Sequence, residues 1–144
     1  MNTKVLDLMS KNVVTAQPHE TVAAVKTKMT KKKLRHIPIV SLDNEPVGVI
    51  SASDLVSAEK EGTPVSNVMT GDVVTIPDYE DASVAAKMMR NHKIHHLVVT
   101  HEKSVIGIIS SFDLLKLVEG RRFVMKNPST PKTKGLGKRA KSEL

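Results

Sequence analysis

The chain has 144 residues, a formal net charge of +7 and an apolar fraction of 40%, with aromatic residues making up only 2%. Without cysteine it cannot form disulfides, thiolate nucleophiles or zinc–thiolate sites, and with no Trp and two Phe it lacks the stacking platforms of single-stranded nucleic-acid binders. No apolar run approaches the roughly 18 residues of a membrane span and the N-terminus has no signal-peptide pattern, so we expect a cytoplasmic protein with no membrane partner.

The positive charge is concentrated at one end of the chain. Residues 1–120 hold 14 basic and 14 acidic residues, whereas residues 121–144 hold eight basic residues and one acidic residue. This C-terminal segment is rich in Pro, Gly, Ser and Thr and nearly free of apolar side chains, so it cannot bury enough surface to offset the entropy of ordering it. We therefore predict that residues 121–144 form a disordered basic tail.

The first predicted elements are a short strand and a helix. Val13, Val14 and Thr15 form a run that favours a strand, and Pro18 ends it. From residue 20 to residue 33, apolar side chains recur at positions 22, 25 and 29, which is the spacing of one helix face. The start of the chain therefore predicts a strand followed by a helix.

Two further strands and a short helix follow. Residues 36–40 read as a strand that Pro38 restricts to a sheet edge or a bulge, because proline has no N–H to donate. Residues 43–46 have the composition of a hairpin turn, and residues 47–50 return as the next strand. Ser51 then opens a helix that we expect to reach residue 58.

The second half of the chain repeats this pattern. Residues 48–55, Gly-Val-Ile-Ser-Ala-Ser-Asp-Leu, correspond to residues 107–114, Gly-Ile-Ile-Ser-Ser-Phe-Asp-Leu. Upstream, identical residues recur at a constant shift of 60, which falls to 59 after the turn at residues 42–45. The linker 61–64 is too short to separate independent domains. We therefore expect a first unit (residues 1–62) and a second unit (residues 63–120) to dock about a pseudo-two-fold axis and to form related clefts.

Together these features resemble a known family. The element order, the segments Asp7-Leu8-Met9 and Asn67-Val68-Met69 before each first strand, and the two Gly-apolar-apolar-Ser-x-x-Asp-Leu segments are similar to a tandem pair of cystathionine-β-synthase (CBS) domains, a Bateman module. The resemblance covers about residues 3–120. It implies an α/β (α+β) fold of two pseudo-symmetric β-α-β-β-α units. It also implies a regulatory ligand, namely AMP, ADP, ATP or S-adenosylmethionine, and no required cofactor.

Two serine–aspartate pairs, Ser51 with Asp54 and Ser110 with Asp113, allow two compatible interpretations. A serine followed three residues later by an acid is a variant of the helix capping box. Free N–H groups at a helix start also attract phosphate, and an aspartate in the first turn can accept bonds from both ribose hydroxyls. The resemblance implies that Asp54 and Asp113 bind ribose. It places these serines near the sugar or the phosphates: Ser51, Ser53, Ser110 and Ser111.

The resemblance also implies positions for the base and the phosphates. Backbone groups of Thr15-Ala16 and Thr75-Ile76 would face the adenine edge, beside an apolar wall made of Ile37-Pro38 and Leu97-Val98. Because Phe112 stands where the first unit has Ser53, and Val98 where it has Pro38, we expect the two sites to differ in affinity. Cations at a helix C-terminus are usual without any ligand, but four residues after the long helices are candidates for phosphate contact: Arg35, His36, His95 and His96.

Other chemistries find little support in the sequence. His92, His95 and His96 run from a helix end into a strand, so their rings diverge, and no carboxylate joins them at ligand spacing. There is no P-loop, no Gly-x-Ser-x-Gly segment and no paired acid and base outside the repeated aspartates. We therefore predict no catalytic and no metal-binding residues, and a stand-alone regulatory module that is not an enzyme.

The expected partners follow from this interpretation. These 144 residues hold no effector domain of their own, so we expect the signal to pass to an unidentified protein partner or to a second copy of the chain. Apolar stripes on the helices after Ser51 and Ser110 favour a homodimer. The alternative interpretation is a nucleic-acid-associated protein whose basic tail binds non-specifically through counterion release.

Overall fold

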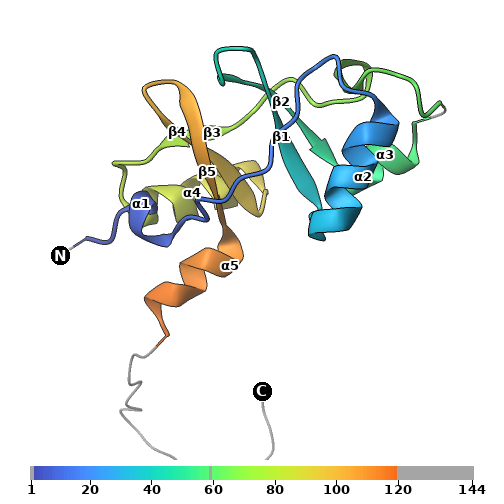
Figure 1. Ribbon diagram of the computed structural model, residues 1–144. Helices are drawn as coiled ribbons and strands as arrows, with labels where there is room; N and C mark the ends of the chain where they lie inside the picture. The colour runs from blue at the N-terminus through green and yellow to red at the C-terminus, as the bar shows by residue number, and fades with distance from the viewer. Residues whose placement is uncertain (1, 59, 120–144) are drawn as a thin grey trace, which may run out of the picture.

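The computed structural model describes residues 2–58 and 60–119. Two similar halves lie side by side, each with a small sheet and its own helices (Figure 1). This confirms the predicted α/β fold of two related units. The predicted disorder of residues 121–144 concerns residues outside the described part. Within the described part, no helix combines the length and apolar character that crossing a bilayer requires.

The second unit contains a three-stranded sheet. β3 (Thr75–Pro77) pairs in parallel with β4 (His96–His101), and β4 pairs antiparallel with β5 (Ser104–Ser110). Helix α4 (Ala82–His92) makes the crossover that a parallel pair requires. After β5 come α5 (Ser111–Leu114) and a 3₁₀ turn, η2 (Leu115–Leu117). The predicted apolar face of α4 packs into the core beside the sheet.

The first unit has the same plan with one strand fewer. β1 (His36–Val40) pairs antiparallel with β2 (Pro46–Ser51), and α2 (Val22–Lys32) and α3 (Ala52–Val56) pack beside them. β1 lies at the edge of this sheet and carries a bulge between Ile39 and Val40, as Pro38 predicts. Helix α2 is shorter than predicted, because the Thr21 hydroxyl caps its start and Lys33 leaves the helical conformation with a φ of 57°.

The strand predicted at residues 13–15 is wrong. Only Ala16 forms an isolated bridge, to Ile39, and in the second unit the strand begins two residues later than predicted, at Thr75. Proline explains the difference between the units. Val98 donates its N–H to the carbonyl of Val74 at 3.3 Å, whereas the equivalent Pro38 has no N–H to donate.

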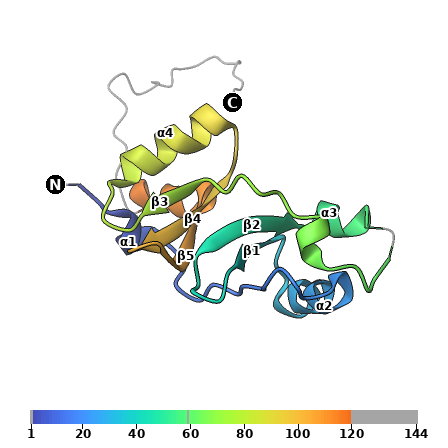
Figure 2. The same ribbon diagram turned by 90° about the horizontal axis from the view of Figure 1, so that it is seen from above.

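Each unit is completed by the chain segment that precedes the other unit. Helix α1 (Val5–Leu8) packs into the core of the second unit, beside α4 (Figures 1 and 2). The Val5 N–H donates to the Glu80 carbonyl at 2.8 Å, and the Val65 N–H of the 3₁₀ turn η1 (Val65–Asn67) donates to the Glu20 carbonyl at 2.8 Å. The units therefore exchange these two segments across the pseudo-two-fold axis.

Small apolar side chains fill the contact between the halves. Val40, Val98 and Val105 are buried there, and further valines pack against them. The Asn44 side chain donates to the carbonyl of Val105 at 2.9 Å and to the Ser104 hydroxyl at 2.8 Å. The halves therefore dock directly, as the short linker predicted, and the clefts described below lie along their contact surface.

Candidate functional site

The two exchanged segments cross the sheet of the opposite unit at a glycine. Ser10 and Ile108 exchange N–H···O bonds of 2.8 and 3.1 Å, and Thr70 and Val49 do the same at 3.0 and 2.9 Å. Gly107 allows the first crossing, since a Cβ atom there would lie 2.6 Å from the Ser10 carbonyl oxygen. Each crossing brings a segment of one unit to the Ser–Asp helix start of the other.

A cleft opens beside the first crossing. We call it the Arg35 cleft; its volume is about 420 Å³. It joins the N-terminal segment of the chain to the start of α5. Its lining consists of Ser10, Asn12, Val13, Val14, Leu34, Arg35, His36, His95, His96, Ile108, Ser110, Ser111, Phe112 and Asp113.

A second cleft opens beside the other crossing. We call it the Asp72 cleft; its volume is about 240 Å³. It joins the segment after η1 to the start of α3. Its lining consists of His36, Val49, Ser51, Asp54, Thr70, Asp72, Val73, Val74, Ile94, His96 and Val98. The positions match those of the Arg35 cleft through the repeat, with Asp72 in the place of Asn12 and Asp54 in the place of Asp113.

The predicted capping boxes are present in both clefts. The Ser51 N–H donates to Asp54 Oδ2 at 2.9 Å and the Asp54 N–H donates to Ser51 Oγ at 3.1 Å. Ser110 and Asp113 repeat this geometry at 2.9 and 3.0 Å. Each carboxylate is therefore held in position by one of its two oxygens.

The helix starts themselves offer less to a phosphate than the sequence suggested. α3 has five residues and α5 has four. Their first N–H groups are already engaged, since Ala52 donates to the Arg35 carbonyl at 2.9 Å and Ser111 donates to the His95 carbonyl at 2.7 Å. A phosphate in these clefts would depend on side chains rather than on the helix N-terminus.

The second carboxylate oxygen differs between the two aspartates. Asp113 Oδ1 lies 3.4 Å from Lys116 Nζ. For Asp54 Oδ1, no hydrogen bond or ion pair is formed with a residue in the described ranges 2–58 and 60–119. Both side chains are half-buried in the cleft wall, so their second oxygen, Oδ1, is still accessible from the cleft. The two hydroxyls of a ribose could therefore bind a carboxylate whose position the capping box has already fixed.

Two histidines meet between the clefts and line both of them. The ring centroids of His36 and His96 are 3.9 Å apart, with the ring planes inclined by 42°. Burial, followed by the nearby His36 and His95, lowers the pKa of His96 to about 4. Burial, followed by the charge of Arg35, also lowers the pKa of His36, against an opposing effect of Asp54. Both rings are therefore neutral at pH 7 and can donate one hydrogen bond each.

The structure brings together a large part of the predicted site residues. Seven of them line the Arg35 cleft: Arg35, His36, His95, His96, Ser110, Ser111 and Asp113. Five line the Asp72 cleft, two of which are shared with the first: His36, Ser51, Asp54, His96 and Val98. The charged candidates and three of the four candidate serines thus gather at two equivalent positions.

Of the predicted base-binding residues, only Val98 lines a cleft. Ala16, Ile37, Ile76 and Leu97 are no more than 1% exposed and belong to the hydrophobic cores, because alternate residues of a strand face opposite sides. Thr15, Pro38, Ser53 and Thr75 line neither cleft. Apolar lining comes instead from Val13-Val14 and Val73-Val74, two positions before the backbone segments that were predicted to face the adenine edge.

Sequence reasoning also missed Ser10, Asn12, Thr70 and Asp72. The repeat register does pair them, Ser10 with Thr70 and Asn12 with Asp72. However, no local pattern indicates that a segment before the first strand reaches the opposite unit. Only the crossings at Ile108 and Val49 reveal this.

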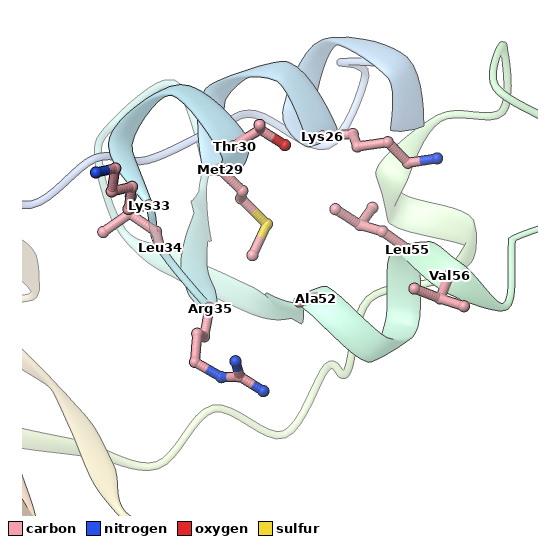
Figure 3. Close-up of a pocket in the computed structure, with 9 residues that line it drawn as sticks. All are labelled: Lys26, Met29, Thr30, Lys33, Leu34, Arg35, Ala52, Leu55 and Val56. Atoms are coloured by element: carbon pink, nitrogen blue, oxygen red, sulfur yellow. The ribbon is translucent and has the colours of Figure 1, made fainter.

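Two further grooves lie on the outer helical faces. Figure 3 shows the groove of the first unit, with Met29 of α2 facing Leu55 of α3. Its volume is about 440 Å³, and Val56 at its rim is 82% exposed. The Arg35 side chain extends away from the Met29 sulfur in this view. An equivalent groove of about 380 Å³ in the second unit includes Met89 and Leu114.

Among residues 2–58 and 60–119, no group of three or more histidine, cysteine or acidic side chains is arranged to hold a metal ion. His95 and His96 line the Arg35 cleft together, whereas His92 at the end of α4 does not. The chemistry that this arrangement offers is hydrogen bonding and charge complementarity.

Comparison with known proteins gives consistent matches. The family description CBS domain matches residues 5–61 and 65–120. A homoserine O-acetyltransferase of Methanosphaerula palustris is 32% identical over 81% of this chain, and an inosine-5'-monophosphate dehydrogenase of Halobacterium salinarum is 33% identical over 73%. The matched segments cover 24% and 22% of those relatives, so the chain spans about a quarter of their length.

Solved structures agree with the sequence matches. The CBS domain pair of protein MJ0100, crystallised with 5'-methylthioadenosine and S-adenosyl-L-methionine, superposes with a TM-score of 0.75 at 27% identity, covering 85% of this chain and all of that one. A protein described as AcuB from Vibrio cholerae gives 0.74 at 28% identity, covering 82% and 91%. Two adjacent domain matches, the two related units of the fold and the paired clefts have one explanation: the chain belongs to the CBS domain family and is a tandem pair of CBS domains.

Proposed function

We propose that this chain is a regulatory module that binds adenine nucleotides or adenosyl compounds in the Arg35 and Asp72 clefts. The observation that carries the proposal is the same in both clefts: a half-buried aspartate, fixed through one oxygen by its own capping box, faces a cleft of ligand size. The related domain pair of protein MJ0100 was crystallised with two adenosyl compounds, and the cytosolic domain of the magnesium channel MgtE, 25% identical, with ATP. Both support this ligand class.

Each part of such a ligand has a suitable partner. The ribose hydroxyls would donate to the second oxygen of Asp54 or Asp113. The base would lie against the paired valines that line each cleft, and in the Arg35 cleft the exposed ring of Phe112 is available for stacking. Arg35 and the neighbouring histidines supply the donors for phosphate oxygens.

The position of the clefts explains how occupancy could become a signal. Each cleft is lined by both units, so a ligand contacts both sides of the valine-filled surface between the halves. A ligand that binds one relative arrangement of the halves better than another shifts the population toward that arrangement. In this proposal the chain performs no catalysis and acts on a partner protein or on a second copy of itself.

The test is calorimetric titration with AMP, ADP, ATP and S-adenosylmethionine. Asp54→Ala and Asp113→Ala should each weaken binding about 10- to 100-fold, because a charge-assisted hydrogen bond contributes about 1.5–3 kcal/mol. Asp7→Ala is a matched control: Asp7 accepts the Lys4 N–H at 3.0 Å in the capping box of α1 but lines neither cleft. If affinity is unchanged in both cleft variants and their melting temperatures fall as in the control, Asp54 and Asp113 only cap their helices and do not bind the ligand.

A further inference from the structure

The two clefts are equivalent in fold but differ in charge. The Arg35 cleft holds one arginine and three histidines against one carboxylate, Asp113, and Lys116 already lies beside that carboxylate. The Asp72 cleft holds two carboxylates, Asp54 and Asp72, and neither lysine nor arginine is among the residues that line it. His36 and His96 line both clefts and therefore do not contribute to this difference.

Three substitutions between the repeats produce the difference. Asn12 of the Arg35 cleft becomes Asp72 in its counterpart, which adds a negative charge. Arg35 becomes His95, and in the Asp72 cleft that position does not contribute to the lining. Lys116, the cation beside Asp113, has Ser57 at the equivalent position next to Asp54.

The consequence for a bound ligand is electrostatic. Charges that lie closer together than the Debye length of about 8 Å at physiological salt still interact. Two carboxylates therefore disfavour a phosphate anywhere in the Asp72 cleft and favour a cation.

We propose that the clefts divide the ligands by charge: the Arg35 cleft binds the phosphate-bearing adenine nucleotide, and the Asp72 cleft binds an adenosyl compound whose 5' substituent is cationic, such as a sulfonium. This inference rests on the proposed function, because it assigns different ligands to the two adenosyl sites. The module then senses two ligand classes at once, through clefts that share His36 and His96.

The first experiment assigns each ligand to a cleft by calorimetry, with ADP and S-adenosylmethionine as probes. Asp113→Asn should weaken ADP at least tenfold more than it weakens S-adenosylmethionine. Asp54→Asn should do the reverse. If both ligands lose affinity through the same variant, or equally through both variants, the division by charge is wrong while adenosyl binding stands. If neither ligand binds the unaltered chain, the proposed function fails and the division fails with it.

The second experiment tests the charge itself. Asp72→Asn gives the Asp72 cleft the same residue type that the Arg35 cleft has at the equivalent position, Asn12. It should lower the preference for S-adenosylmethionine over uncharged-sulfur S-adenosylhomocysteine by roughly fivefold, the size of one exposed charge pair. The matched variant Asn12→Asp should weaken ADP relative to adenosine by a similar factor. Unaltered preferences in both variants would overturn the electrostatic argument, and a melting curve for each variant checks that it is folded.

Discussion

The glycine at the first crossing offers a direct test of how the Arg35 cleft is built. In Gly107→Ala the new Cβ would lie 2.6 Å from the Ser10 carbonyl oxygen and 2.8 Å from Met9 Sδ. The methionine side chain can move, but the carbonyl belongs to a backbone held by two hydrogen bonds to Ile108. Overpacking of this kind costs about 1–3 kcal/mol. At roughly 4 °C per kcal/mol for a domain of this size, the melting temperature should fall by about 4–12 °C.

Urea and thermal unfolding measure this effect, with Gly71→Ala as the control because nothing lies within 4 Å of a Cβ at Gly71. Gly48→Ala provides a graded comparison: its Cβ would meet the Met69 sulfur, while the nearest backbone atom, the Thr70 carbonyl oxygen, is 3.1 Å away. It should therefore cost less than Gly107→Ala. Because Ser10 lines the Arg35 cleft, Gly107→Ala should also weaken ADP. Equal stability of the Gly107 and Gly71 variants would refute the crossing as described.

Three other predictions concern pH, assembly and the basic tail. Since the pKa of His96 is lowered from 6.5 to about 4 in the fold, the unfolded chain binds more protons between these values. Stability should fall by about 1 kcal/mol from pH 6.5 to 4.5, after allowance for partial exposure, and His96→Asn should flatten this fall in urea titrations. Light scattering at tens of micromolar should show a dimer that Val56→Asp weakens, because exposed Val56 borders an outer apolar groove; a monomer with and without nucleotide would contradict this. A chain ending at Gly120 should keep ADP affinity within about twofold, and any DNA or RNA binding should be lost with the tail and weaken steeply with salt. Sequence-selective binding by the shortened chain would instead favour the nucleic-acid interpretation.

The sequence by itself determined the features that depend on neighbouring residues. The Ser51–Asp54 and Ser110–Asp113 capping boxes connect residues three apart, and helices α2 and α4 follow from the spacing of their apolar residues. The repeat predicted the two units, because similar sequences adopt similar folds, and the short linker between them predicted that they dock directly. Of the candidate site, the charged and hydroxyl-bearing residues at the two helix starts could be named in advance.

Only the tertiary structure decided what lies opposite those residues. Ser10 meets Ile108, and Thr70 meets Val49, through bridges between segments far apart in the chain. Their placement depends on α1 and η1 completing the core of the other unit, which no local pattern reports. The same holds for Ile37 and Leu97, apolar strand residues that could face either a ligand or the core until the sheets are packed. Apolar burial is non-directional, so the sequence does not show which surface an apolar side chain will pack against. For the same reason, the sharing of each cleft between the two units becomes visible only in the folded chain.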